Sequence, residues 1–478
     1  MKLSLIMCGV EEYEDIEISS LAFNAGDVKA GSLFFCLVGT KADGHDYAVE
    51  AMRHGAVAIV AQRRTNADLP HIIVGDTRHA LSAAACRFYG EPSKKMKMIA
   101  VTGTNGKTTT TYILKSILEA AGKKCGVIGT NAILIGDERR EATLTTPDPI
   151  ELNAVLRDMC DAGVEYVVME ASAHALALKK LDGIIFDVAA FTNLSRDHLD
   201  FFGDMDSYFE AKKTLFTPLH AKYAVINADD TKGAEIGRDC LIPYITYGCE
   251  NPADVFSVNL SMSVNGIEYV LNLSDDIGKV KFNLTGKFNM YNTLCAAATA
   301  SVLGVELKYI LEGIRSLKRV DGRLNVINAS KCDIIIDFAH TDDGLENILR
   351  AVKEFAPKRI ITVFGCGGDR DRTKRPVMGK IASSLSDLCI ITSDNPRTED
   401  PQSIIDEVAA GVEQSKKAFV LCIVDRKEAI KAAISRAEQG DIVVIAGKGA
   451  EKYQDIMGIK QPYNDEEYVL GLIKQGEI

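Results

Sequence analysis

The sequence predicts an α/β protein of three domains, each with its own sheet. Its 478 residues exceed the size of about 250–300 residues at which a single core stops growing. From about residue 98 onward, short apolar runs alternate with amphipathic stretches. This alternation is typical of mainly parallel sheets that are covered by helices on both faces. Glycines and polar residues follow several of these runs directly, which places loops at the carboxyl ends of the predicted strands.

Residues 1–93 are predicted to form a small N-terminal α/β domain. Its strand candidates are the apolar runs 32–38 and 56–61, and several glycines separate its first elements. Glu91-Pro92, followed by Ser93-Lys94-Lys95, is predicted to be a linker to the next domain.

Residues 94–320 are predicted to form the central domain. Its first strand leads into Gly103–Thr109, and the helix that follows is expected to end at Gly122. A strand, a glycine-bearing loop and a helix in this order predict a P-loop ATPase-like domain with a parallel sheet. Around 255–284 the apolar period changes to two, with a turn at Asn265-Gly266, which indicates an antiparallel insertion. The expected strands are 98–101, 166–169, 188–192 and 223–226, and a helix is expected over 289–303.

Residues 321–478 are predicted to form a C-terminal Rossmann-like domain, a second doubly wound unit. Its strand candidates alternate with helical stretches, and no internal repeat is visible. The expected strands are 334–337, 360–364, 388–392, 419–424 and 442–446.

Composition excludes several classes of protein. The formal net charge of -11 argues against nucleic acid as the main partner. The 12 cysteines include no CxxC pair, so we expect free thiols in a reducing compartment rather than a zinc site. The N-terminus is a poor secretory signal, and no run of about 18 apolar residues is present, so we expect a cytoplasmic protein without membrane insertion.

The loop Gly103-Thr104-Asn105-Gly106-Lys107-Thr108-Thr109 is the sharpest local signal. In this context, backbone N–H groups and a helix N-terminus cradle phosphate oxygens. Lys107 would meet the β/γ-phosphates of ATP, and the Thr108 hydroxyl would bind Mg²⁺. Val101 stands where a nucleotide loop usually has glycine or alanine, so the loop is a variant. The alternative is a tight strand–helix turn with an incidental lysine.

Other candidate residues are less specific by pattern. Glu170 and Ser172 follow the predicted strand ending at Met169, where doubly wound folds place metal and substrate groups. His198 alone favours a structural role, since Mg²⁺ prefers oxygen ligands. Lys212 alone is typical of a solvated helix face.

Three polar loops follow predicted strands of the C-terminal domain. They are Gly365–Arg372, Asp394-Asn395-Pro396-Arg397 and Gly447–Glu451. Carboxyl ends of parallel strands meet at one edge, so we expect the loops to share a crevice. Their Asp, Glu and Arg side chains suit a ligand with both ammonium and carboxylate groups, such as an amino acid. Three capped turns without a ligand are the alternative.

Together these strings resemble the Mur ligase family, most closely its MurE type, over nearly the whole chain. MurE-type ligases add the third amino acid to the UDP-N-acetylmuramoyl dipeptide in peptidoglycan synthesis. The resemblance lies in residues 43–45, 103–109, 145–147, 170–174, 193–200, 211–212, 286–292, 322–323, 337–341, 365–370, 394–397 and 447–451, in family order.

The resemblance implies a role for each matching residue. ATP would bind at Gly103, Thr104, Asn105, Gly106, Lys107, Thr108, Thr109, Asn292, Arg323 and Asp337. Mg²⁺ would bind at Thr108, Glu170, His198 and a carbamylated Lys212, the N6-carboxylysine of the family. The UDP-linked substrate would contact Phe23, Ala25, Thr40, Lys41, Ala42, Thr145, Thr146, Ser172 and Lys180. The incoming amino acid would contact Arg370, Asp394, Asn395, Pro396, Arg397, Gly447 and Glu451. Lys107, Lys212 and His198 would be catalytic.

The string Asp394–Arg397 resembles that of ligases that add meso-diaminopimelate. Arg370 and Arg397 can pair with its distal carboxylate and Glu451 with its ammonium, whereas lysine would leave the arginines unpaired, at a cost of about 1–3 kcal/mol. We therefore expect transfer of the ATP γ-phosphoryl group to the D-glutamyl carboxylate, followed by attack of the diaminopimelate amine on the acyl phosphate. We expect a monomer. The alternatives are the L-lysine-adding ligase, folylpolyglutamate synthase, and a non-catalytic nucleotide-binding paralogue.

The chain departs from the family pattern at a few positions. Asn24-Ala25-Gly26 replaces Asp-Ser-Arg, and Thr40-Lys41-Ala42 replaces His-Gln-Ala. Lys180 occupies a position where the family usually has arginine, Ala450 one where it has histidine, and Asp342 one where it has proline. These departures bear on the binding of uridine and dipeptide and leave the phosphate loop unchanged.

Overall fold

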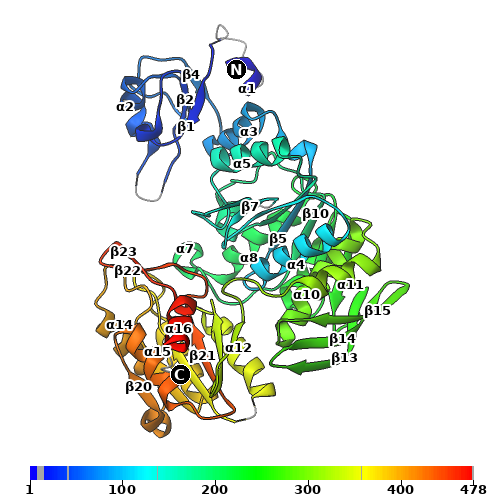
Figure 1. The fold of residues 1–478 in the computed structure, drawn as a ribbon. Helices are drawn as coiled ribbons and strands as arrows, with labels where there is room; N and C mark the ends of the chain where they lie inside the picture. Colours follow the sequence, from blue (N-terminus) through cyan, green and yellow to red (C-terminus); the bar gives the residue numbers. More distant parts are fainter. Residues whose placement is uncertain (8–15, 40–41, 137, 357, 476–478) are drawn as a thin grey trace.

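The computed structural model describes residues 1–7, 16–39, 42–136, 138–356 and 358–475, and three large sheets follow one another along the chain (Figure 1). The N-terminal sheet has four parallel strands in the order β1-β2-β3-β4, with cores on both faces. Its strands are β1 (Ser20–Ala22), β2 (Ser32–Phe35), β3 (Ala56–Ala61) and β4 (His71–Ile73), and its helices are α1 (Leu3–Ile6), α2 (Ala48–Arg53) and α3 (Thr77–Phe88).

The central sheet has eleven strands in the order β15-β14-β13-β12-β11-β10-β5-β9-β6-β7-β8. The strands from β13 to β6 in that order are parallel, and an antiparallel hairpin is added at each edge. The strands are β5 (Lys97–Thr102), β6 (Cys125–Ile128), β7 (Ile133–Ile135), β8 (Glu138–Arg140), β9 (Tyr166–Glu170), β10 (Val188–Phe191), β11 (Ala224–Asn227), β12 (Tyr244–Gly248), β13 (Val255–Ser263), β14 (Gly266–Leu273) and β15 (Asp276–Phe282).

Helices cover both faces of the central sheet. Ile99 and Val101 of β5 point into one core, while Met98 and Ala100 point into the other, as expected for a strand buried on both sides. The helices are α4 (Lys107–Ala120), α5 (Pro149–Asp161), α6 (Ala173–Ala177), α7 (Leu199–Phe202), α8 (Met205–Lys213), α9 (Thr231–Asp239), α10 (Lys287–Val302) and α11 (Leu307–Ser316).

The C-terminal sheet has six strands in the order β16-β17-β21-β18-β19-β20, all parallel except β16. A separate hairpin, β22–β23, follows β21. The strands are β16 (Asn325–Asn328), β17 (Cys332–Asp337), β18 (Ile360–Phe364), β19 (Leu388–Ile391), β20 (Val420–Cys422), β21 (Asp441–Ala446), β22 (Tyr453–Ile456) and β23 (Ile459–Pro462). The helices are α12 (Asp342–Phe355), α13 (Lys374–Leu385), α14 (Pro401–Ala409), α15 (Arg426–Arg436) and α16 (Asp465–Lys474).

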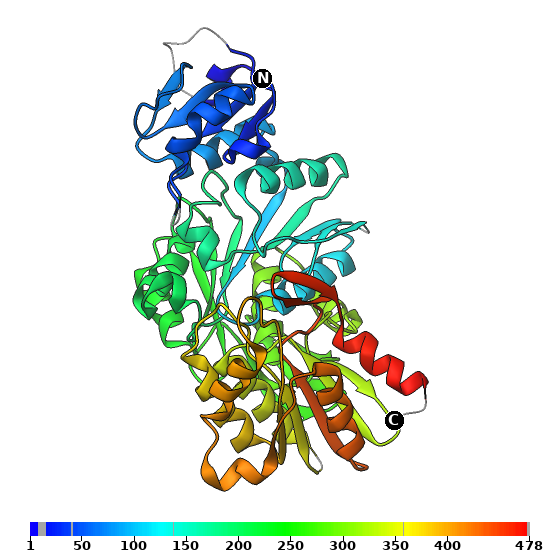
Figure 2. The ribbon, with the colours of Figure 1, turned by 90° about the vertical axis from the view of Figure 1, so that its left-hand side faces the viewer.

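The three sheets lie in three successive layers of an elongated molecule, with the two termini in the outer layers (Figures 1 and 2). The α/β fold class and the predicted antiparallel insertion are confirmed. The predicted linker at residues 91–95 contains regular structure. Pro92–Lys95 form a 3-10 helix whose Pro92 and Ser93 are buried, because the segment packs against α5. Among the described residues, no helix has the length and apolar character needed to cross a membrane.

Candidate active site

The loop Gly103–Thr109 connects β5 to α4, and two of its glycines leave no room for a side chain. Gly103 and Gly106 have positive φ angles of 144° and 86°. A Cβ on Gly103 would lie 1.9 Å from Thr192 Oγ1, and one on Gly106 would lie 2.3 Å from Asn292 Oδ1. Only glycine therefore permits this close approach of the loop to its neighbours.

Lys107 opens α4, and its side chain folds over the loop. Its Nζ donates hydrogen bonds to the carbonyls of Gly103 at 2.8 Å and Thr104 at 2.7 Å. Desolvation lowers the pKa of Lys107, and the Glu170 carboxylate opposes that shift. The ammonium is thus held at the start of a helix, where an anion is also favoured by the backbone N–H groups.

Glu170 ends β9 with a side chain that is 1% exposed. It accepts hydrogen bonds from Thr108 Oγ1 at 2.9 Å and from the backbone N–H of Thr130 at 2.9 Å. Arg323 Nη2 donates to the same Thr108 hydroxyl at 3.2 Å. A carboxylate, a hydroxyl and a guanidinium therefore meet beside the phosphate loop, although these residues are far apart in the chain.

Lys212, on α8, is 1% exposed and reaches the same loop from the other side. Its Nζ donates to the Gly103 carbonyl at 2.9 Å and lies 4.4 Å from the centre of the Tyr208 ring. Burial lowers the pKa of Lys212 well below its ordinary value, and the nearby Lys107 ammonium lowers it further. The solvated helix face that the local pattern suggested for Lys212 is therefore wrong.

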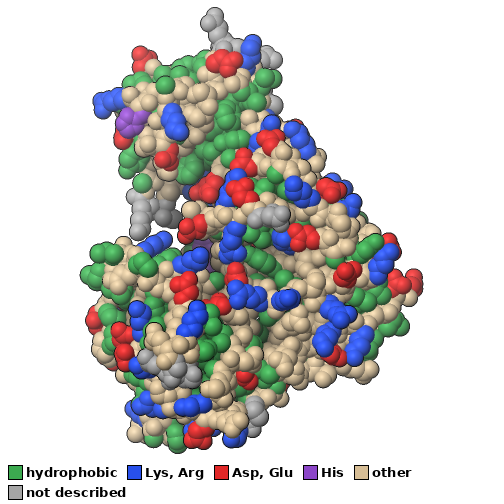
Figure 3. Space-filling view, in the orientation of Figure 1, with side chains coloured by type: hydrophobic (Ala, Val, Ile, Leu, Met, Phe, Trp, Pro, Cys, Tyr) green, Lys and Arg blue, Asp and Glu red, His purple; other side chains and the backbone are tan. Residues whose placement is uncertain are grey.

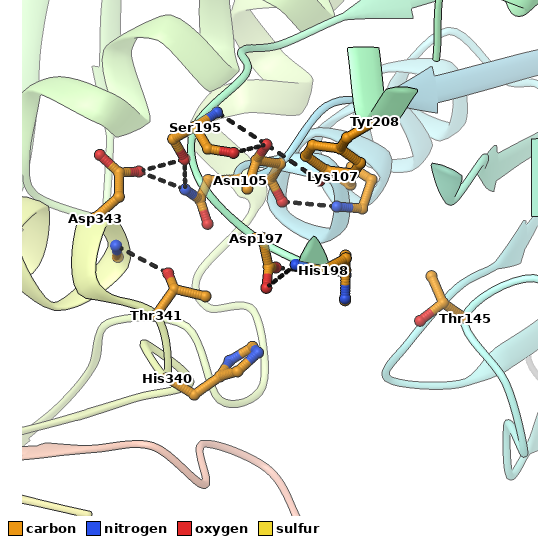
Figure 4. A network of polar contacts seen from close by, with 12 residues as sticks. Asn105, Lys107, Thr145, Ser195, Asp197, His198, Tyr208, His340, Thr341 and Asp343 are labelled. Atoms are coloured by element: carbon orange, nitrogen blue, oxygen red, sulfur yellow. Dashed lines mark hydrogen bonds and ion pairs between the residues drawn. The ribbon is translucent and has the colours of Figure 1, made fainter. Parts of the chain in front are cut away.

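His198 lies beside this group in the loop after β10 (Figure 4). Burial lowers its pKa to about 4, with Asp197 opposing the shift. Its ring makes an edge contact with His174, with 4.7 Å between centroids. The described residues contain no cluster of three or more His, Cys, Asp or Glu side chains arranged as a metal site.

Asn292, on α10, faces the phosphate loop and is 5% exposed. Its Nδ2 donates to Asn289 Oδ1 at 3.0 Å, and its Oδ1 is an acceptor for Thr110 Oγ1 at 3.5 Å. Asn289 was not predicted from the sequence, although its spacing of three residues from Asn292 places both on one helix face.

Asp337 ends β17 and accepts hydrogen bonds from the backbone N–H groups of Leu324 and Ala339, both at 2.8 Å. Burial raises its pKa, and Arg323 opposes that rise. The guanidinium carbon of Arg323 lies 4.8 Å from the centre of the Phe338 ring. Arg323 and Asp337 therefore share one corner of the C-terminal sheet, next to Thr108.

Thr146 and Ser172 lie next to Glu170. Thr146 Oγ1 donates to the Glu170 carbonyl at 2.8 Å and lies 3.1 Å from Ser172 Oγ. Thr145 Oγ1 lies 3.0 Å from Thr130 Oγ1. Three of the nine residues predicted for the UDP-linked substrate, Thr145, Thr146 and Ser172, thus lie close to Glu170 and the phosphate loop.

The predicted residues of the N-terminal domain are less closely grouped. Phe23 and Lys180 line one small pocket between the first and second sheets, where Lys180 Nζ lies 2.8 Å from Asp148 Oδ1. Ala25 packs into the core on the opposite face of the N-terminal sheet from Phe23, and Ala42 is exposed. Thr40 and Lys41 lie outside the described residues.

The three polar loops of the C-terminal domain meet at one edge, as expected from the parallel strands. A Cβ placed on Gly367 would lie 2.9 Å from Arg397 Nη1 and 3.9 Å from Arg370 Cγ. A Cβ on Gly447 would lie 2.4 Å from Asp394 Oδ2. The loops after β18, β19 and β21 thus pack against one another, and the edge where they meet is the proposed amino-acid crevice.

Lys448 is a member of this crevice that the sequence did not single out. It is fully buried, and its Nζ donates to Asn395 Oδ1 at 2.9 Å and Glu451 Oε2 at 2.7 Å. Asn395 Nδ2 also donates to Glu451 Oε2 at 2.9 Å. Glu451 therefore has a cationic partner within the chain, and the place of Lys448 inside the motif Gly447–Glu451 is the signal that could have indicated it.

The loop after β10 joins the phosphate loop to the C-terminal domain (Figure 4). Ser195 Oγ and Asn105 Nδ2 both donate to Asp343 Oδ2 on the first turn of α12, at 2.9 and 2.7 Å. Arg196 lies 3.6 Å from Asp371, next to the Arg370 loop. Lys and Arg side chains gather on this face between the central and C-terminal layers (Figure 3).

Three sequence models of Mur ligase domains match the chain in order. The Mur ligase family catalytic domain matches residues 17–89, the middle domain 101–300, and the glutamate ligase domain 322–449.

Relatives match over nearly the full length. The UDP-N-acetylmuramoyl-L-alanyl-D-glutamate--2,6-diaminopimelate ligase of Clostridium botulinum is 42% identical over 99% of this chain and 100% of its own. The enzyme of the same name from Geobacter sulfurreducens is 43% identical over 96% and 95%.

Solved structures match as well. That of a UDP-N-acetylmuramoyl-L-alanyl-D-glutamate--2,6-diaminopimelate ligase superposes with a TM-score of 0.72, at 31% identity over 100% of this chain and 99% of its own. Folylpolyglutamate synthase of Mycobacterium tuberculosis, at 18% identity and a TM-score of 0.64, covers 77% of this chain and 92% of its own, and shares the fold. With its three matching domains and these full-length relatives, the chain belongs to the Mur ligase family.

Proposed function

We propose that this ATP-dependent amide-bond-forming ligase adds meso-diaminopimelate to UDP-N-acetylmuramoyl-L-alanyl-D-glutamate in peptidoglycan synthesis. The observation that carries the choice of amino acid is the meeting of three polar loops at the edge of the C-terminal sheet. Arg370 and Arg397 flank Gly367, and Asp394 Oδ2 is buried without a hydrogen-bond partner among the described residues. Two guanidinium groups suit a distal carboxylate, and an unpaired carboxylate oxygen suits an ammonium.

The contacts of Glu451 change the expected division of roles. Because Lys448 already neutralises Glu451, Asp394 is the better acceptor for the substrate ammonium. We propose that Asn395, Pro396, Gly447 and Glu451 shape the crevice around Asp394. L-lysine lacks the distal carboxylate and would leave the two arginines without that partner.

We propose that ATP binds with its phosphates on residues 103–109 and its nucleoside toward Asn292, Arg323 and Asp337. The backbone N–H groups of the loop and the Lys107 ammonium would hold the phosphate oxygens. These residues orient the γ-phosphoryl group toward the D-glutamyl carboxylate, which Thr145, Thr146, Ser172 and Lys180 position. Phosphoryl transfer to that carboxylate breaks the bond between the β- and γ-phosphates, releases ADP and gives an acyl phosphate. Attack by the neutral amine then forms the amide as the amine loses a proton and phosphate leaves.

The residues beside the phosphate loop fit a magnesium ion. Thr108 and Glu170 offer oxygen atoms 2.9 Å apart, which is the ligand type that Mg²⁺ prefers. When bound, Mg²⁺ would offset negative charge between the phosphates and the acceptor carboxylate. His198 is held neutral by its lowered pKa, so one of its ring nitrogens remains able to accept a proton or bind a metal.

We propose that Lys212 carries a carbamate, as the resemblance to the family implies. Burial and the Lys107 ammonium lower the pKa of Lys212, which favours the neutral amine, the form that attacks carbon dioxide. The N–C bond forms as the amine loses one proton, and the product is a carboxylate-like oxygen ligand. Carbamylation would place an anion beside the Lys107 ammonium.

We further propose that residues 1–93 hold the uridine nucleotide, 94–320 ATP and 321–478 the amino acid, in a cytoplasmic monomer. Phe23, Ala25, Thr40, Lys41 and Ala42 would form the nucleotide side. Phe23 supports this proposal through its place in the same pocket as Lys180.

Phosphate release from ATP in the presence of the UDP-linked dipeptide tests the function. Meso-diaminopimelate, L-lysine and no amine are compared at equal concentration. Release with diaminopimelate alone is expected. Release with lysine instead would keep the enzyme class and overturn the assignment of Arg370 and Arg397. Amine-independent binding of ATP without release would favour the non-catalytic paralogue.

A further inference from the structure

Two loops of the amino-acid crevice each hold one residue in a left-handed backbone conformation. Asp369, before Arg370, has φ of 53°, and Arg397 has φ of 51°. Non-glycine residues rarely adopt these angles, and they persist where the surroundings fix them. The backbone at Asp369 and Arg397, which presents the Arg370 and Arg397 side chains to a ligand, is therefore held in place by contacts with other parts of the chain.

The two loops are bonded directly to each other. Arg397 Nη1 donates to the Gly368 carbonyl at 2.6 Å, and the Gly368 N–H donates to the Asn395 carbonyl at 2.9 Å. Thr398 Oγ1 donates to Asp369 Oδ1 at 2.8 Å, and the Thr398 N–H donates to Asp369 Oδ2 at 3.2 Å. A shift of either loop would therefore move the other.

Behind the loops lies Arg375, on the first turn of α13, with no exposed surface on its side chain. Its Nη1 and Nη2 donate to the two oxygens of Glu399 at 2.9 and 2.8 Å, and Nη2 also donates to the Gly367 carbonyl at 3.3 Å. Glu399 Oε1 in turn accepts the N–H of Asp369 at 2.6 Å. The hydrogen bonds of Arg375 lower the pKa of Glu399 to about 2, so this carboxylate stays charged.

We propose that the buried Arg375–Glu399 pair is the positioning element that sets the geometry of both substrate-facing arginines, Arg370 and Arg397, and through them the selectivity for the amino acid. This inference rests on the proposed amino-acid crevice and adds to it residues that do not touch the ligand. The pair contacts one loop through Gly367 and Asp369, and Glu399 follows the other loop by two residues. A bidentate pair fixes direction as well as distance, which a lysine at position 375 would not.

Kinetics of Arg375→Gln and of the milder Thr398→Val test the proposal. A displacement of about 1 Å can cost up to about 100-fold in a positioned reaction, so we expect Arg375→Gln to raise the KM for meso-diaminopimelate by about 10- to 100-fold. The KM values for ATP and the UDP-linked dipeptide should stay near those of the wild type. Thr398→Val, which removes one link between the loops, should shift the same constant less.

Lys380→Gln is the matched control. Lys380 lies on the same helix as Arg375, its side chain is exposed, and its Nζ lies 3.6 Å from Glu413, away from the contacts of Arg375 and Glu399. Its KM values should equal those of the wild type. Equal rises in all three KM values of Arg375→Gln, or an unchanged diaminopimelate KM in a folded variant, would overturn the proposal.

Amide hydrogen exchange gives a readout that needs no substrate. The Gly368 and Thr398 amides should exchange faster in Arg375→Gln than in the wild type or Lys380→Gln. Unchanged exchange at both amides would refute the positioning role. If the wild type released no phosphate with diaminopimelate, the proposed function would be wrong. Amide hydrogen exchange would still test whether the Arg375–Glu399 pair positions the loops. If Arg375→Gln did not fold, Thr398→Val would decide by the same two readouts.

Discussion

Asn105 of the phosphate loop donates a hydrogen bond of 2.7 Å to the carboxylate of Asp343, which belongs to the C-terminal domain (Figure 4). Burial raises the pKa of Asp343, and its hydrogen bond from Ser195 opposes that rise. This contact joins the loop proposed to bind ATP to the domain proposed to bind the amine. The phosphate loop and the C-terminal domain must be correctly placed relative to each other before amide formation can follow phosphoryl transfer.

Asp343→Ala is expected to lower kcat/KM for diaminopimelate-dependent phosphate release about 100- to 10,000-fold. Hydrogen bonds to a charged group contribute about 1.5–3 kcal/mol each, and this variant removes two of them. Asp342→Ala is the control, because it removes the neighbouring carboxylate and leaves both of these bonds to Asp343 in place. Equal activities of the two variants would contradict the coupling.

Gly106→Ala should abolish most of the nucleotide affinity and destabilise the fold. The new Cβ would lie 2.3 Å from Asn292 Oδ1, so the loop or α10 must move. Gly122→Ala is the matched control, because Gly122 also has positive φ, 73°, but has open space around its Cβ position. The control should lose only the backbone cost of about 1–2 kcal/mol and keep its ATP affinity. Urea unfolding and calorimetric titration with ATP measure both, and equal losses would refute the steric argument.

Lys212→Ala should lose nearly all turnover and regain part of it with added acetate or propionate. A small carboxylate can occupy the space of the proposed carbamate and supply its oxygens. The neighbouring Lys213, whose Nζ pairs with Asp239 at 2.6 Å on the helix surface, provides the control. Lys213→Ala should be active and indifferent to carboxylate. A Lys212→Ala enzyme that no carboxylate rescues would leave the carbamate unsupported.

His198 should make the protein less stable in mild acid. Burial lowers its pKa to about 4, whereas histidine in an unfolded chain titrates near about 6.5. Between these values the unfolded state binds more protons, so the free energy of unfolding falls as pH falls through this window. His198→Gln should flatten that dependence in urea unfolding at pH values from about 7 to about 4, measured without Mg²⁺ or nucleotide. The same slope in both proteins would show that His198 is not the titrating group.

Local sequence patterns predicted the strands and the loops at their ends, because burial on both sheet faces leaves a continuous apolar run. Val188–Phe191 and Ile360–Phe364 were found within one residue of the expected bounds. The strand expected over residues 419–424 is shorter than predicted. It covers Val420–Cys422, because Phe419 ends a 3-10 helix and so cannot begin the strand.

Contacts between distant segments were not predictable in the same way. Lys212 looked like a surface lysine because its helix gives no sign of the Gly103 carbonyl that accepts its hydrogen bond. Arg375 precedes Pro376 in an ordinary polar stretch, and its burial depends on Glu399, which lies 24 residues later. Long-range polar pairs leave no periodic signal, whereas apolar faces do.

The place of Asn292 against Gly106 has a consequence for synthesis on the ribosome. Asn292, which contacts Gly106, lies 186 positions after that glycine in the chain. Thr192, in the segment after β10, also follows Gly106 in the sequence. A nascent chain that has emerged only as far as α4 therefore holds the loop sequence without the walls that shape it. Domains fold as units during translation, so the nucleotide site is completed near the end of the central domain's emergence. Binding of nucleotide by a ribosome-stalled chain would therefore show that the central domain has completed its fold.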